Sequence, residues 1–153
     1  MSSHLPSGSA RAHLGRSVAY HAWDQDQPPE VEIEPGDELE LCLRDGSNAQ
    51  LDRSSSAETM LGLDPAQMDP LTGPVWVKGA EPGDVITVEL LEISLAKWGW
   101  SGIIPGLGLL HDKFPGPLLR TWDLTGTGVD IGNDLEFAMS PMLGVIGVAP
   151  AQP

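Results

Sequence analysis

Apolar and polar residues alternate along the chain from Val31 onward. The apolar positions are Val31, Ile33, Leu39, Leu41 and Leu43, with acidic residues or Cys42 between them. Because successive side chains of a strand point to opposite faces, this pattern predicts two strands with one buried and one hydrated face. Glu34-Pro35-Gly36-Asp37 lies between them and is typical of a tight turn.

The same strand–turn–strand pattern occurs a second time. Val75–Val77 precedes the turn Glu81-Pro82-Gly83-Asp84, and the apolar segment Val85–Ile93 follows it. We expect the two units to form paired hairpins in one sandwich or barrel. A duplication and independent convergence on a common turn both explain the recurrence.

Other segments complete the expected fold. Two further segments have the composition of strands, Leu118–Leu124 and Leu143–Val148, and the residues Thr125–Asn133 are rich in turn formers. The helix candidate is Ser54–Met68, and Gly62 and Pro65 limit it to about two turns. The sequence therefore predicts a mostly β fold, a sandwich or partial barrel with long Gly- and Pro-rich loops and at most one or two short helices. Residues 1–16 are small and polar and predict a flexible N-terminal arm, followed by one β-rich domain over residues 17–153.

The segment Trp98–Leu110 breaks the alternation. Two tryptophans flank Gly99, and the apolar run that follows is interrupted by glycines and by Pro105. We expect neither a regular helix nor a central strand here, because Pro105 lacks a backbone donor and glycine favours open backbone. Large rings beside such backbone indicate a pocket wall, and a buried loop that packs a β core is the alternative.

Charge and cysteine content narrow the function. Eight basic and 22 acidic residues give a formal net charge of −14, which argues against nucleic acid and anionic membrane surfaces as partners. A neutral small substrate and metal cations remain compatible. Cys42 is the single cysteine, so no intrachain disulfide forms, and we expect it to be a small buried hydrophobe. No apolar signal core or membrane-length apolar run occurs, and a cytoplasmic protein is expected.

Three ordered strings connect the chain to a known family. They are 70–77 with 79–85, then 98–110, then 143–150, and a looser match begins at His21. In order and spacing they resemble the acetamidase/formamidase family of amide hydrolases, whose members are roughly twice as long. The chain is similar to the N-terminal half of such a protein. The resemblance implies cleavage of a short aliphatic amide to carboxylate and ammonia, with Thr72, Gly73, Trp98 and Trp100 at the substrate pocket.

Candidates for catalysis are few. The chain contains no GxSxG, CxxC, HExxH or HxH motif, so a nucleophile within it lacks support. The resemblance makes His21 and Asp45 candidates for catalysis or for binding a divalent metal, Zn or Ca. In the family the loop that contains this Asp ends in Gly-Gln, and here Ala49 replaces the Gly. Asp69 occupies a position where the family more often has Asn or His. The alternative makes Asp45 and Asp69 turn-capping residues and His21 a half-buried hydrogen-bonding residue.

The resemblance also indicates which catalytic segments of the family lie outside these 153 residues. The family's second half carries His-, Gly- and Asp-containing segments to which most catalytic and metal-binding groups belong. We therefore expect a chain that is weakly active or inactive alone. Its expected partners are a small amide substrate and either a complementary C-terminal-half chain or further copies in a homo-oligomer. The other function classes are a non-catalytic remnant and a small β binding or oligomerisation module.

Overall fold

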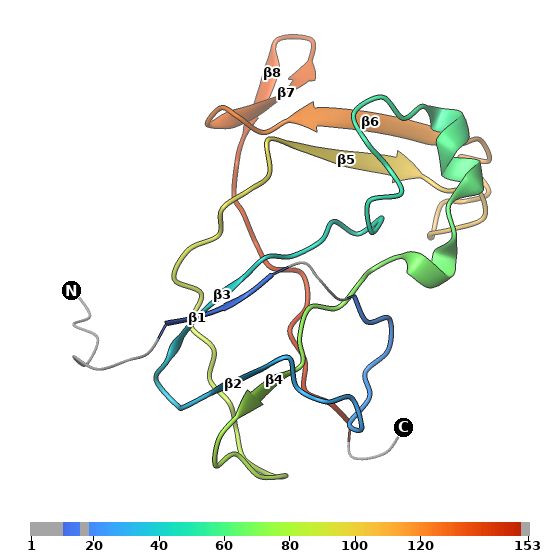
Figure 1. Cartoon of the computed structure of the whole chain (residues 1–153). Coiled ribbons are helices and arrows are strands. Elements are labelled where there is room, and N and C mark those ends of the chain that lie inside the picture. Colours follow the sequence, from blue (N-terminus) through green and yellow to red (C-terminus); the bar gives the residue numbers. More distant parts are fainter. Residues whose placement is uncertain (1–10, 16–18, 151–153) are drawn as a thin grey trace. The chain divides into compact units, whose positions relative to one another are not determined.

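The computed structural model describes residues 11–15 and 19–150 (Figure 1). In chain order its elements are β1 (Arg11–Leu14), β2 (Val31–Ile33), β3 (Glu38–Leu41), the 3-10 helices η1 (Ala57–Gly62) and η2 (Pro65–Gln67), β4 (Val75–Val77), β5 (Trp98–Ile103), β6 (Leu118–Asp123), β7 (Gly128–Gly132) and β8 (Leu135–Ala138). The mostly β class with short helices is confirmed. The chain divides into two compact units, which are described separately.

Unit 1 comprises the residues up to Ala49, Ala66–Val88 and the residues from Gly147 on. β1 pairs with β3, and β2 pairs with β4, both in parallel register. The alternation that predicted strands at 31–33 and 39–43 is therefore confirmed for β2 and most of β3. Cys42, just past β3, is half-buried rather than fully buried, and its N–H donates to the Leu14 carbonyl at 2.9 Å.

The N-terminal arm prediction is wrong for four of its residues. Arg11–Leu14 form β1, which is hydrogen-bonded to β3, and Leu14 is only 8% exposed. The local sequence is polar, but burial of Leu14 and a partner strand stabilise it. Residues 1–10 and 16 of the predicted arm lie outside the described residues.

The two Glu-Pro-Gly-Asp turns have matching geometry. In the first, the Asp37 N–H donates to the Glu34 carbonyl at 3.1 Å and the Glu34 N–H donates to the Asp37 carboxylate at 2.9 Å. In the second, Asp84 and Glu81 form the same two bonds at 3.0 and 2.9 Å. The glycine of each turn has a left-handed φ, 93° and 105°, which explains the residue type.

The turns do not make hairpins, contrary to the prediction. β2 pairs with β4 and β3 pairs with β1, so the first turn carries the chain from one two-stranded sheet to another. After the second turn, Val85–Ile93 forms no strand, and Leu143–Val148 forms none either. Alternation specifies which face of a segment is apolar but not which segment pairs with it, and parallel pairing joins strands distant in sequence.

Unit 2 comprises Gln50–Pro65 and Glu89–Ile146. β5 and β6 form an antiparallel pair, and β7 and β8 form a hairpin. The helix η1 lies against β6 and β5 and buries Met60, which is 1% exposed. The helix candidate at 54–68 is thus realised as the two short 3-10 helices. Within the described residues, no helix has the length and apolar character needed to cross a bilayer.

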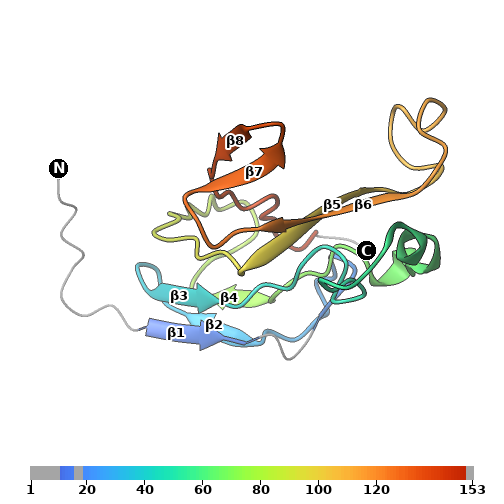
Figure 2. The ribbon, with the colours of Figure 1, turned by 90° about the horizontal axis from the view of Figure 1, so that it is seen from above.

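The segment Trp98–Leu110 starts as a strand, β5, but β5 belongs to a two-stranded sheet and so is not the central strand that the prediction excluded. Its six residues pair in continuous register with β6, and the break begins only at Ile104. The strand accepts glycine because a Cβ on Gly102 would meet Met60 of η1, so the missing side chain permits close approach. The loop 104–117 then extends beyond the ends of β5 and β6 (Figure 2).

The hairpin β7–β8 lies partly in a region expected to be only turns. Asn133 and Asp134 both have left-handed φ, 57° and 58°, which is the conformation of a two-residue hairpin turn. The sequence signal for this hairpin is the alternation of apolar residues on both sides of the turn, Val129 and Ile131 before it and Leu135 and Phe137 after it.

Candidate functional site

Three predicted loops meet in unit 1. The Asp69 N–H donates to the Gly46 carbonyl at 2.8 Å, next to Asp45, and His21 Nδ1 lies 3.3 Å from the Met68 carbonyl, next to Asp69. An antiparallel bridge between Tyr20 and Leu71 holds two of the loops together. The segments that carry His21, Asp45 and Asp69 are therefore neighbours. His21 is exposed rather than half-buried, but its contact with the Met68 carbonyl is a hydrogen bond of the kind that the alternative predicted.

The Asp45 carboxylate is engaged by its own loop. It accepts hydrogen bonds from the Ser47 N–H at 3.0 Å, the Ser47 hydroxyl at 2.6 Å and the Ala49 N–H at 3.2 Å. Ser47 is fully buried, and Asn48 and Ala49 both have left-handed φ. This is the turn-capping arrangement that the alternative predicted. A catalytic or metal-binding role for Asp45 stays a prediction.

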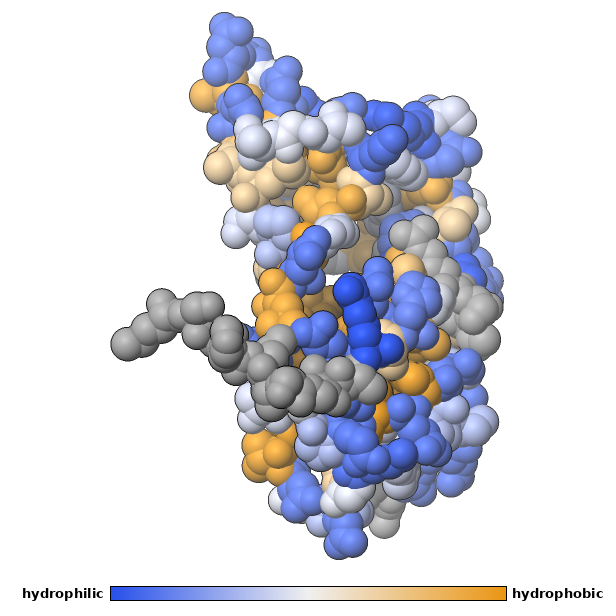
Figure 3. All heavy atoms as spheres, turned by 60° about the vertical axis from the view of Figure 1, so that its left-hand side comes forward, coloured by the Kyte–Doolittle hydropathy of each residue, from blue (hydrophilic) through white to orange (hydrophobic). Residues whose placement is uncertain are grey.

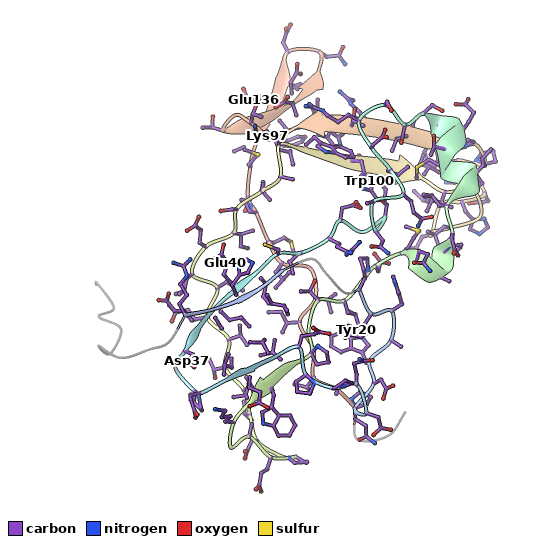
Figure 4. All side chains as sticks on the ribbon, in the orientation of Figure 1. Tyr20, Asp37, Glu40, Lys97, Trp100 and Glu136 are labelled. Carbon is purple, nitrogen blue, oxygen red and sulfur yellow. The ribbon has the colours of Figure 1, made fainter. Side chains whose placement is uncertain are left out.

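Tyr20 is a member of this loop group that the sequence analysis did not single out. Its hydroxyl donates a very short hydrogen bond to Glu30, and that bond raises the pKa of Tyr20 above its usual value (Figure 4). Adjacency to His21 in the sequence was the one signal pointing to it. The phenol is therefore held protonated at the edge of the His21 loop.

A metal site is not complete in the described parts of the chain. Across residues 11–15 and 19–150, no group of three or more His, Cys, Asp or Glu side chains is arranged to hold a metal ion. The oxygens of Asp45 accept bonds from the loop, so the residues present do not fit a site by themselves. The expected Zn or Ca would need ligands from elsewhere and stays a prediction.

The predicted substrate-binding residues of unit 1, Thr72 and Gly73, lie in the loop that leads into β4. Gly73 is buried, has a left-handed φ of 133° and precedes a cis bond to Pro74. A Cβ at Gly73 would lie 3.4 Å from the Val75 nitrogen. The Glu30 N–H donates to the Pro74 carbonyl at 2.9 Å, which ties this segment to the start of β2. Contact of Thr72 or Gly73 with a substrate stays a prediction.

The predicted substrate-binding residues of unit 2 lie on β5. Trp98 and Trp100 are half-buried and, because they are two residues apart, share one face of the strand with Gly102. Figure 4 shows Trp100 on β5. Met60 covers this face at Gly102. On the opposite face the Trp122 indole N–H donates to the Ser101 hydroxyl at 2.8 Å, and the Arg120 guanidinium lies 4.2 Å from the Trp122 ring centroid. The tryptophans thus belong to an ordered pair of strands, and a substrate role for them stays a prediction.

Asp123, opposite Trp98, has a strongly shifted carboxyl group. Hydrogen bonds from the Thr125 hydroxyl and N–H, and then from Arg53 at 3.0 Å, lower the pKa of Asp123 to about 2. Since the folded pKa lies below the unfolded value, the group stabilises the fold above about pH 4, and this contribution is lost as the pH falls to about 2.

We expect Thr125→Val to raise the pKa of Asp123 more than Arg53→Met does, because the Thr125 hydroxyl is the largest cause of the shift. Carboxyl-carbon NMR titration of the parent and both variants measures this. A larger shift in Arg53→Met would show that Arg53, rather than Thr125, is the main cause of the lowered pKa of Asp123.

Comparison with known proteins decides what these units represent. The sequence profile of the acetamidase/formamidase family matches residues 9–153. The chain belongs to this family. A formamidase from Methylophilus methylotrophus is 33% identical over 113 residues, which cover 70% of this chain and 28% of that protein.

Solved structures agree with the assignment. A predicted acetamidase/formamidase from Thermoanaerobacter tengcongensis matches 94% of this chain with a TM-score of 0.84 and 30% identity, and the match covers 47% of that chain. A γ-lactamase from Delftia acidovorans matches 78% of this chain with a TM-score of 0.74 and 34% identity, over 31% of its own length. This acetamidase/formamidase family member therefore spans less than half the length of these relatives.

Proposed function

We propose that this chain takes part in hydrolysis of a short aliphatic amide to carboxylate and ammonia, together with a complementary second part. The carrying observation is the family match, which extends over residues 9–153 and includes both the Thr72-Gly73 and the Trp98–Leu110 segments. The identity to a formamidase supports the linear amide as substrate class.

Amide hydrolysis needs a nucleophile, stabilisation of the oxyanion and an acid for the leaving ammonia. This chain offers the substrate side. The Trp98 and Trp100 rings present rigid apolar surface. The nucleophile and the acid would come from the second part, and so would most ligands of a Zn or Ca ion.

We expect the isolated chain to release ammonia from formamide and acetamide at least about 10²-fold more slowly than the Methylophilus methylotrophus formamidase, because removal of a catalytic acid or base costs about that factor. Ammonia release from the purified proteins measures this. Turnover by the isolated chain on the order of 10 s⁻¹ would contradict the need for a second part.

Turnover restored by a second part would distinguish an amide hydrolase from the non-catalytic alternatives. A chimaera of this chain and the unmatched length of the Thermoanaerobacter tengcongensis protein should hydrolyse amides if the chain retains its substrate side. No turnover in a folded chimaera would favour the alternatives, a non-catalytic remnant or a small β binding or oligomerisation module.

A cyclic amide is the second candidate substrate. The likeness to the Delftia acidovorans γ-lactamase, at 34% identity, favours it. A γ-lactam has the same scissile bond within a five-membered ring, so 2-pyrrolidinone and acetamide differ mainly in the pocket volume they need. The ratio of kcat/KM for these two compounds in the chimaera decides between them.

A further inference from the structure

Two extended segments of unit 2 face each other across an open hollow. Residues 90–93 and 141–143 line it, and its volume is about 490 Å³. Both segments have strand-like apolar composition, yet neither is a strand in this structure. Among the described residues, the backbone of neither segment is hydrogen-bonded to another strand. The hollow is therefore bordered by backbone that is free to pair.

The side chains beside the hollow are apolar except for Glu92, and several of them are exposed. Leu90 and Leu91 are 52% and 57% exposed, and Met142 is 76% exposed. The second segment continues with Val145 and Ile146, which are 71% and 55% exposed. Figure 3 shows hydrophobic residues lying open among hydrophilic ones on one face of the molecule. Exposed apolar side chains beside extended backbone without a hydrogen-bonded neighbour are typical of an interaction site.

We propose that this hollow receives an extended, apolar strand from the part of the family fold that the chain does not span. The backbone of this chain superposes over 94% of its length on the Thermoanaerobacter tengcongensis protein, while 53% of that protein lies outside the match (100% less the 47% matched). The relative thus carries ample further chain to pair with these segments. The inference rests on the proposed function, since it names the partner that the reaction needs.

Charge favours this occupant over a second copy of the same chain. Glu89 and Glu92 lie in or beside the first segment, and residues 79–96 contain no Lys or Arg. Symmetric pairing of two copies would bring these carboxylates together, and each copy carries a net charge of −14. The strand that fits is therefore neutral or basic where it faces Glu89 and Glu92. Strand addition of this kind uses backbone hydrogen bonds for affinity and side-chain pockets for specificity.

Amide hydrogen exchange tests the proposal independently of catalysis. The probe is the chimaera of the full chain and the unmatched length of the Thermoanaerobacter tengcongensis protein, in which the linkage raises the effective concentration of the partner. We expect amides of residues 90–93 and 141–146 to exchange rapidly in the chain alone and at least about 100-fold more slowly in the chimaera.

Variants within the chimaera locate the contact. Leu91→Glu and Met142→Glu should each abolish the protection, because a carboxylate would be buried without a partner. Leu109→Glu is the matched control, since Leu109 is 99% exposed and lies in the 104–117 loop of the same unit. It should leave the protection unchanged.

Three results would overturn the proposal. They are rapid exchange at both segments in the chimaera, slow exchange in a monomer of the chain alone, and a dimer of the chain alone that Leu91→Glu dissociates. The last result would make a second copy the occupant. Because none of these readouts depends on turnover, a protected but inactive chimaera would refute the proposed function and leave this inference standing.

Discussion

Gly102→Ala is expected to lower the free energy of unfolding of unit 2 by about 2–3 kcal/mol, as overpacking of a close contact does. A Cβ at this position would lie 2.6 Å from Met60 Cε and 2.7 Å from the Leu118 carbonyl oxygen. The methionine can move, but the carbonyl belongs to the paired strand β6 and cannot move without breaking the ladder. Urea denaturation followed by tryptophan fluorescence measures the loss.

Gly62→Ala is the matched control for this prediction. Gly62 ends η1 in the same unit, and a Cβ there would meet nothing within 4 Å. We expect the urea midpoint of Gly62→Ala to stay near that of the parent protein. An unchanged midpoint in Gly102→Ala as well would show that η1 and the β5–β6 pair are not packed as closely as the structure has them.

Asp45→Ala is expected to destabilise unit 1 by about 1–3 kcal/mol, because it removes the acceptor of three hydrogen bonds within its own loop. The carboxylate accepts bonds from the Ser47 hydroxyl and from the Ser47 and Ala49 N–H groups, and Ser47 is fully buried. Asp45→Asn retains a side-chain oxygen that can accept these bonds and should lose less. Thermal unfolding by circular dichroism compares the two variants.

The same pair of variants distinguishes structure from catalysis at Asp45. If the residue only caps its loop, Asp45→Asn should keep both stability and the turnover of the chimaera. A stable Asp45→Asn chimaera that loses turnover would show that the negative charge itself is used. An Asp45→Ala chain as stable as the parent would contradict the capping role.

Local residue patterns were sufficient to predict several elements. Alternating apolar residues predicted β2 and β3, the recurrence of the strand–turn–strand pattern predicted β4, and apolar composition predicted β6. Pro and Gly predicted the two Glu-Pro-Gly-Asp turns, because each glycine must adopt a left-handed φ. The ordered strings at 70–85, 98–110 and 143–150 predicted the family, which the match over residues 9–153 confirmed. Each of these features depends on a few consecutive residues, so the sequence alone determines it.

Only the tertiary structure decided how these pieces combine. The parallel pairing of β1 with β3 and of β2 with β4 could not be predicted, because alternation encodes a face and not a partner. β5 is a strand despite its glycines because η1 packs where Gly102 lacks a side chain. Val85–Ile93 has the composition of a strand and is none, because a strand exists only where a neighbour supplies hydrogen bonds. The sequence thus determined the conformational preference of each segment, while contacts between distant segments decided which preferences were realised.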